Sequence, residues 1–287
     1  MLAQILSGGI TIGVIYGLIA LGFVLLYNGT GVIHFGYGEQ AALGAYYVVV
    51  IQTFLGGALL VAVPAAILLS TLTGALIYLA IMRPLSKTSI LIQLIATLAI
   101  GMALRELMRA LMGASAWPAP FLLSPAPFEF ASLQLVPAQL AILGVVLATF
   151  LLLYLFLERT RYGKAVLAAC ENPTGASLVG ISTSRVFLSI WMLSSAVAGL
   201  AGILIAPILT LSPELGLIAI KGFVAAVIGG FTLGGAVVGG VALGIIETLS
   251  GVYISTALKD VVTFGVLILV LLVRPQGLAG VVTIKKV

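Results

Sequence analysis

Ionisable side chains are scarce in this chain, and three of them interrupt long apolar runs. His34 and Glu39 fall within the glycine-rich stretch NGTGVIHFGYGEQAALGAYY at 28–47, and Glu247 ends a second glycine-rich run at 216–247. A carboxylate surrounded by hydrocarbon costs a few kcal/mol, so such a group pairs, faces a protein interior or lines a wet cavity. Glu39 has no basic neighbour in the sequence, so a partner must come from another segment. The candidates are Arg105, Lys221 and His34.

Two interpretations of Glu39 remain open. It caps or pairs within a helix bundle, or it lies on a path through the protein. His34 is interpreted as a hydrogen-bonded interior group or as part of the same path. Glycine in a helix interior costs about 1 kcal/mol relative to alanine, so five glycines between Gly29 and Gly44 predict a broken or re-entrant segment.

The other residue types that perform chemistry are absent or isolated in the sequence. There is no phosphate-binding loop, no serine, histidine and acid set, no cluster of metal ligands and no arginine-rich voltage sensor. The one cysteine, Cys170, excludes an internal disulfide and a cysteine-rich metal site. The sequence predicts that the chain is not an enzyme and holds neither a metal nor a cofactor of its own.

The elements that hold these residues are predicted to be membrane helices. Hydrophobic residues make up 62% of the chain and charged residues 7%, and the mean hydropathy is +1.32. A chain this apolar cannot cover itself with a polar surface, and lipid-facing backbone must bond within its own segment, so the fold class is all-α. Apolar segments are predicted at 3–27, 33–54, 57–82, 89–112, 137–157, 186–210, 217–234, 236–256 and 260–273.

The prediction is therefore one polytopic membrane domain over 1–287, with about eight or nine transmembrane or re-entrant helices. Segments 33–54 and 217–234 are the two that need not cross fully. Glycine-interrupted segments in both halves also indicate an internal repeat around a central pathway, although tight helix packing explains the glycines equally well. The predicted pathway residues are His34, Gly36, Gly38, Glu39, Gly229, Gly230 and Gly234. Two further stripes are predicted to be packing faces: Gly9, Gly13 and Gly17; and Ser194, Ala198 and Gly202.

Loop charge predicts the orientation, because cytoplasmic loops carry an excess of lysine and arginine. The loop at 113–136 has neither and is placed outside, and counting spans places the N-terminus outside as well. Three basic regions are placed in the cytoplasm: Arg83 and Lys87; Arg159, Arg161, Lys164 and Arg185; Arg274, Lys285 and Lys286. The net charge of +5 is thus attributed to topology rather than to nucleic-acid binding.

The longest cytoplasmic loop, ERTRYGKAVLAACENPTGASLVGISTSR at 158–185, combines small, apolar and basic residues. Asn172-Pro173 is predicted to restart the chain, with a second short helical turn over 174–178. One interpretation is a solvated connector. The other is a docking surface, because a connector has no need to expose Val166, Leu167, Leu178, Val179 and Ile181.

Four stretches of the chain, taken in order, resemble a known family. They are HFGYGEQAALGAY, RYGKAVLAACENPTGASLVGI, KGFVAAVIGGFTLGGAVVGGVALGIIE and VLLVRPQGLAG. Over nearly its whole length it resembles the LivH-type permease subunits of branched-chain amino acid ABC importers, the hydrophobic amino acid uptake family. The resemblance implies a multi-pass protein of the bacterial inner membrane that moves branched-chain or related amino acids from periplasm to cytoplasm.

The resemblance also implies partners. They are a second, LivM-like permease, two ABC ATPase subunits that bind the ATP, and a periplasmic binding protein. It places the contact with the ATPase in the 158–185 coupling loop, at Gly163, Lys164, Ala168, Glu171, Asn172, Gly175, Ala176, Leu178, Gly180 and Ile181. Two alternatives from other classes stay open: an ion-coupled secondary transporter using Glu39 or Glu247, and a passive channel for a small solute such as urea.

Overall fold

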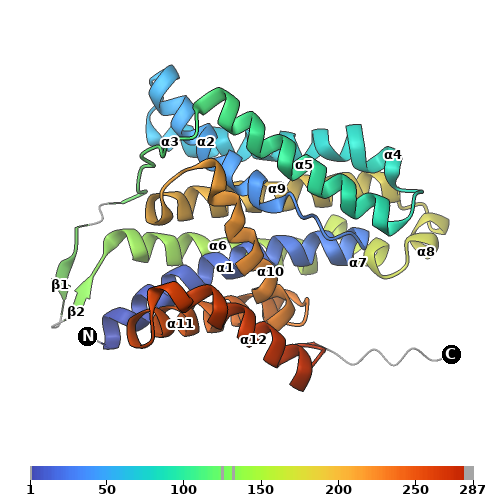
Figure 1. Ribbon diagram of the computed structural model, residues 1–287. Helices are drawn as coiled ribbons and strands as arrows, with labels where there is room; N and C mark the ends of the chain where they lie inside the picture. The colour runs from blue at the N-terminus through green and yellow to red at the C-terminus, as the bar shows by residue number, and fades with distance from the viewer. Residues whose placement is uncertain (1, 124–125, 131–132, 281–287) are drawn as a thin grey trace. The chain divides into compact units, whose positions relative to one another are not determined.

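The computed structural model describes residues 2–123, 126–130 and 133–280 (Figure 1). Lys285 and Lys286, which were placed in the cytoplasm, lie outside the described residues. The helices are α1 (Leu2–Thr30), α2 (Tyr37–Leu55), α3 (Leu59–Ile77), the π-helix η1 (Tyr78–Met82), α4 (Arg83–Leu85), α5 (Ile90–Met112), α6 (Pro137–Arg159), α7 (Arg161–Glu171), α8 (Pro173–Leu178), α9 (Thr183–Leu209), η2 (Pro213–Leu217), α10 (Ile218–Ile228), α11 (Leu233–Tyr253), η3 (Thr256–Leu258) and α12 (Lys259–Val273). Strands β1 (Phe128–Phe130) and β2 (Leu133–Leu135) form a short antiparallel hairpin.

The all-α, polytopic prediction is confirmed. Among the described residues, seven helices are long and apolar enough to span a membrane: α1, α3 with its continuation to Leu85, α5, α6, α9, α11, and α12 with η3. The two remaining apolar helices, α2 and α10, are those predicted not to cross fully. The hairpin lies within the loop predicted to be outside, where no strand was predicted. The chain is therefore a multi-pass membrane protein.

The described chain divides into two compact units. One contains residues 25–122 and 144–217, and the other contains the described residues within 1–24, 123–143 and 218–287. We call them the α9 unit and the α11 unit after their central helices.

In the α9 unit, α9 packs against both α2 and α3. Small residues permit the approach: a Cβ added at Gly202 would overlap the Ala41 carbonyl, and one at Gly44 would overlap the backbone of Gly199. Ser194 and Ala198 are fully buried on the same helix. The predicted Ser194, Ala198 and Gly202 packing face is confirmed, and it fixes where α2 begins relative to α9.

In the α11 unit, the glycine stripe of α1 packs on α11. A Cβ at Gly13 would lie 2.8 Å from the Gly240 carbonyl oxygen, and one at Gly17 would lie 3.1 Å from the Ala236 carbonyl oxygen. Gly9 meets α11 in the same way at Gly244, 3.2 Å from the carbonyl oxygen. The predicted packing role of this stripe is confirmed.

The turn between α10 and α11 is held by backbone contacts. Gly230 has a φ of 69°, and a Cβ there would lie 2.5 Å from the Gly280 nitrogen. Leu278 N–H donates to the Ile228 carbonyl at 2.7 Å, which ties the turn to the segment after α12. Gly229 meets the backbone of Gly235, whereas Gly234 has open space. Packing accounts for Gly229 and Gly230, and the pathway role of all three glycines stays a prediction.

Candidate transport site and coupling surface

Helix α2 begins in the middle of the α9 unit instead of at a membrane surface. Its N-cap Gly36 lies against Gly101, eleven residues into α5 or about 17 Å along that helix at 1.5 Å per residue. The preceding segment, 31–36, is non-helical, and Phe35 N–H donates to Thr97 Oγ1 at 3.2 Å. The prediction of a broken segment at 28–47 is confirmed, because α1 ends at Thr30 and α2 starts at Tyr37.

Glu39 lies in the first turn of α2 and pairs with Arg105 of α5. The Glu39 side chain is 6% exposed and that of Arg105 is 29% exposed. The carboxylate fits between two glycines, since a Cβ at Gly101 or at Gly216 of η2 would lie 3.1 Å from its atoms. Arg105 was one of three predicted partners and is the one observed. The first turn of a helix also favours a carboxylate, because the helix dipole is positive there.

A second ion pair lies one helical turn further along α5. Arg109 donates to Glu214 of η2 and to Glu106, both at 2.7 Å. Glu214 lies outside the seven candidate spans, and the Arg109 hydrogen bond holds the pKa of its carboxylate below the usual range. Arg105 and Arg109 thus bind α2 and η2 to one face of α5. Glu214 was not among the predicted site residues. It lies in the short sequence SPEL at 212–215, and it is the only acidic residue between the apolar segments at 186–210 and 217–234.

His34 is fully buried in an aromatic environment. Its ring centroid lies 4.9 Å from that of Trp191 on α9 and 6.4 Å from that of Tyr37. Nearby, Tyr37 donates to the Ser194 carbonyl at 2.9 Å, and Ser195 Oγ donates to Gln40 at 3.1 Å. His34, Gly36, Gly38 and Glu39 therefore belong to one buried region around the start of α2.

Lys221 and Glu247 pair with each other in the α11 unit. Lys221 Nζ lies 2.6 Å from Glu247 and 3.2 Å from Asp260 of α12. The pair joins α10, α11 and α12. Lys221 was a candidate partner for Glu39, and the observed ion pairs assign it to Glu247 instead.

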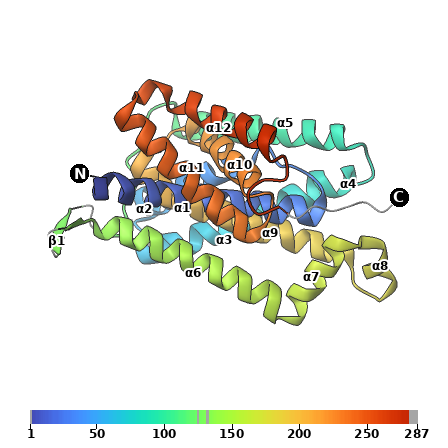
Figure 2. The ribbon, with the colours of Figure 1, turned by 90° about the horizontal axis from the view of Figure 1, so that it is seen from below.

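The segment at 158–185, predicted to be cytoplasmic, forms two helices. Thr160 Oγ1 accepts from Gly163 N–H at 2.9 Å at the start of α7, and Asn172 Oδ1 accepts from Gly175 N–H at 2.8 Å at the start of α8. These are N-caps, and Pro173 at the first helical position of α8 reinforces the second. Gly180, with a φ of 88°, lies in the turn after α8. Figure 2 shows α7 and α8 at the end of α9 where that helix begins.

Exposure divides the predicted coupling residues. Leu178 and Val179 are 84% and 77% exposed, so the end of α8 presents an exposed apolar pair. The prediction that Val166 is exposed was wrong. Gly163, Val166 and Ala169 repeat at every third position and form the buried face of α7. Of the predicted residues, Lys164, Ala168, Glu171, Asn172, Leu178 and Gly180 are exposed, Gly175 and Ile181 are half-buried, and Gly163 and Ala176 are buried.

The thiol of Cys170, at the end of α7, can be labelled to probe this surface. Burial, together with the adjacent Glu171 carboxylate, raises the pKa of its thiol from 9.0 to about 11. The thiolate is the reactive form, so maleimide labelling in the purified protein is expected to be on the order of 100-fold slower at pH 7.5 than for a free thiol. The rate should rise steadily up to about pH 11. A Cys170→Ser, Ser177→Cys variant, with its thiol on exposed α8, is the control, and equal rates for the two proteins would contradict the prediction.

Within the described ranges, no group of three or more histidine, cysteine or acidic residues could hold a metal ion. The α9 unit thus contains one largely buried ion pair, Glu39–Arg105, at the start of α2, and an exposed apolar pair, Leu178 and Val179, at the end of α8.

Comparison with known proteins agrees with this geometry. Residues 5–271 match a family described as "Branched-chain amino acid transport system / permease component". The chain is 34% identical to the high-affinity branched-chain amino acid transport system permease protein LivH of Salmonella typhimurium, over 99% of this chain and 97% of that one. It is 32% identical to the corresponding BraD protein of Pseudomonas aeruginosa, with the same coverage. PsaBC from Streptococcus pneumoniae, solved with a Fab, is similar with a TM-score of 0.53 and 13% identity over 96% of this chain and 97% of that one, which shows a shared fold.

Proposed function

Because the chain belongs to the branched-chain amino acid transport permease family, we propose that it is the membrane permease subunit of an ABC importer. Its substrates are branched-chain or related amino acids, which move from periplasm to cytoplasm across the bacterial inner membrane. The observation that carries the proposal is the family match over 5–271 together with 34% identity over 99% of the chain. Under this proposal 1–287 is a single permease domain, and ATP is bound by partner subunits.

The translocation pathway is proposed to pass the start of α2. Irregular backbone at membrane depth is tolerated only where protein or a water-filled cavity surrounds it, and 31–36 is such a segment. Discontinuous helices of this kind mark the substrate path in many transporters. The Glu39–Arg105 pair holds this break in place, which gives Glu39 a structural or gating role at the edge of the path rather than a proton-relay role.

The coupling surface is proposed to be α7 and α8, with Leu178 and Val179 as the apolar contact for an ATPase subunit. Exposed apolar side chains on the aqueous side of a membrane protein indicate a partner. The exposed polar residues Lys164, Glu171 and Asn172 of the same segment are proposed to contact the same subunit, whereas Ala176 is buried. The remaining proposed partners are a second, LivM-like permease and a periplasmic binding protein.

Reconstitution tests the proposal and its two rivals. The chain would be placed in proteoliposomes with its cognate permease, ATPase subunits and binding protein, and uptake of labelled leucine would be measured. ATP-dependent uptake that also requires the binding protein supports the proposal. Uptake by the chain without an ATPase, driven by a proton gradient, would establish a secondary transporter. Gradient-independent flux without ATP would establish a channel.

Glu39→Gln separates the structural role of Glu39 from a proton-coupling role. Glutamine keeps the shape and the hydrogen bond to Arg105 but removes the charge, so leucine uptake is expected to fall only about two- to fivefold, in line with the loss of one charge-assisted hydrogen bond. Uptake by the wild type and by the variant should be equally insensitive to a protonophore at constant ATP. A dead variant, combined with wild-type uptake that needs the proton gradient, would overturn the proposal.

A further inference from the structure

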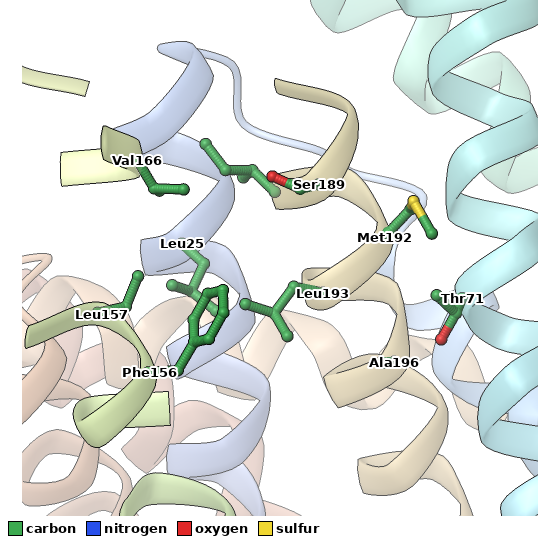
Figure 3. Close-up of a pocket in the computed structure, with 10 residues that line it drawn as sticks. Leu25, Thr71, Phe156, Leu157, Val166, Ser189, Met192, Leu193 and Ala196 are labelled. Carbon is green, nitrogen blue, oxygen red and sulfur yellow. The ribbon is translucent and has the colours of Figure 1, made fainter. Parts of the chain in front are cut away.

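The α9 unit contains an apolar cavity that neither the pathway nor the coupling surface uses. Its volume is about 260 Å³. Figure 3 shows it over one face of α9, with Leu157 and Phe156 of α6 on one side and Thr71 of α3 on the other. Leu25 of α1 and Val166 of α7 complete the lining on the α6 side. All of these elements except α7 are candidate membrane spans, so the cavity lies within the bilayer.

The cavity is chemically suited to hydrocarbon. Its two hydroxyl groups are already occupied: Thr71 Oγ1 donates to the Ile67 carbonyl at 2.7 Å, and Ser189 Oγ donates to the Val186 carbonyl at 2.7 Å. The rest of the lining is aliphatic, aromatic or thioether. A polar solute entering this space would lose its hydrogen bonds to water without replacement.

Along α9 the cavity lies within one leaflet of a bilayer. Its lining residues on this helix run from Ser189 to Ala196. Ala196 lies eleven residues beyond Arg185, which corresponds to about 17 Å at 1.5 Å per residue. Half of the roughly 30 Å hydrocarbon core is about 15 Å. The cavity therefore extends about 10 Å along α9, from about 6 Å beyond Arg185 to the bilayer centre.

Basic residues gather at the cytoplasmic end of the same helices. Residues 158–185 contain four basic and two acidic side chains. The basic ones are Arg159, Arg161, Lys164 and Arg185, and all four are exposed. No ion pair found among the described residues includes any of the four. Such a group at a cytoplasmic membrane surface attracts anionic headgroups, at about 1 kcal/mol per residue.

We propose that this cavity binds one acyl chain of an anionic phospholipid of the cytoplasmic leaflet, with its headgroup on Arg159 and Arg185. The lipid fills the space between α6 and α3 over α9, next to Val166 of α7. Because α7 carries the proposed coupling surface, the bound lipid supports the position of the helix that receives the ATPase. This site goes beyond the transport function and does not depend on which substrate is moved.

Native mass spectrometry of the purified transport complex tests the site. The delipidated complex would be incubated with phosphatidylglycerol or with phosphatidylcholine of identical acyl chains. The wild type is expected to retain phosphatidylglycerol in preference to phosphatidylcholine. Arg159→Gln and Arg185→Gln should each lower retention about fivefold, the effect of one basic residue near an anionic headgroup. Arg83→Gln and Lys87→Gln, in another basic cytoplasmic loop, are the charge controls and should change nothing.

Ala196→Phe tests the cavity itself, because the added ring occupies the space of the acyl chain. It should abolish preferential phosphatidylglycerol retention while the complex still assembles. Should this variant fail to assemble, the two arginine variants decide alone. Equal retention of both lipids by the wild type, or unchanged phosphatidylglycerol retention in the arginine variants, would overturn the proposal. Thiol cross-linking of an Ala196→Cys variant to the second permease would show that a protein chain fills the cavity instead, and would also overturn it.

Discussion

Leucine uptake and substrate-stimulated ATP hydrolysis are expected to be lost when Leu178 and Val179 are both replaced by aspartate. Burying a leucine or valine side chain contributes about 1.5–3 kcal/mol, and the two are 84% and 77% exposed in the isolated chain. Losing both contacts removes about 3 kcal/mol or more of association free energy, a factor of at least about 100 in affinity. The measurement is co-purification of the ATPase with the permease, together with uptake in proteoliposomes.

Two controls make this result specific. Leu178→Ala with Val179→Ala keeps the surface apolar and should give an intermediate loss. Leu123→Asp introduces the same change at a 54% exposed leucine in the loop placed on the opposite side of the membrane, and it should leave ATPase binding intact. Because both coupling residues are already exposed, the aspartate variant should keep the thermal midpoint of the isolated permease. Normal ATPase co-purification would remove α8 from the coupling surface.

The coupling segment also shows how far sequence reasoning reaches. Asn172-Pro173 predicted the restart of the helix correctly, because an N-cap followed by proline is a local signal. Exposure was harder to predict. Val166 was assigned to the docking face together with four other apolar residues, yet it is buried with Gly163 and Ala169. Their three-residue spacing was visible in the sequence and indicated an amphipathic helix. Ala176 is buried too, so a bulky substitution there would test folding rather than docking.

The membrane segments were predictable because hydrocarbon imposes one rule on every span. The boundaries of α5, 90–112 against a predicted 89–112, follow from the length of a largely apolar run that contains only three charged residues. Partner choice follows no such local rule. The charge of Glu39 alone predicts that this residue needs a partner. Its partner Arg105 is 66 residues away in the sequence, and only the packing of α2 on α5 selects Arg105 over Lys221. Glu214 was missed for the same reason, since its partner Arg109 is 105 residues away.

Arg105→Met is expected to be the most destabilising single change among the ion-pair residues. Methionine retains much of the aliphatic volume of arginine but leaves the Glu39 carboxylate, 6% exposed, without its counter-charge. Breaking a buried pair by removing one partner costs about 3–5 kcal/mol, because the remaining charge is uncompensated. The purified complex should show a clearly lower thermal midpoint, and uptake should fall with it. Arg105→Lys keeps the charge and should restore most of the midpoint.

The double variant Arg105→Met, Glu39→Gln decides whether the loss arises from the uncompensated charge. Replacing both partners removes the charge along with its partner, and such replacements are often close to neutral. We therefore expect the double variant to be more stable than Arg105→Met alone, although it contains one more substitution. A double variant as unstable as Arg105→Met would mean that Arg105 acts through packing on α5. If the double variant recovers stability but not uptake, the pair is needed for movement of α2 during transport, because a purely structural pair would restore both together.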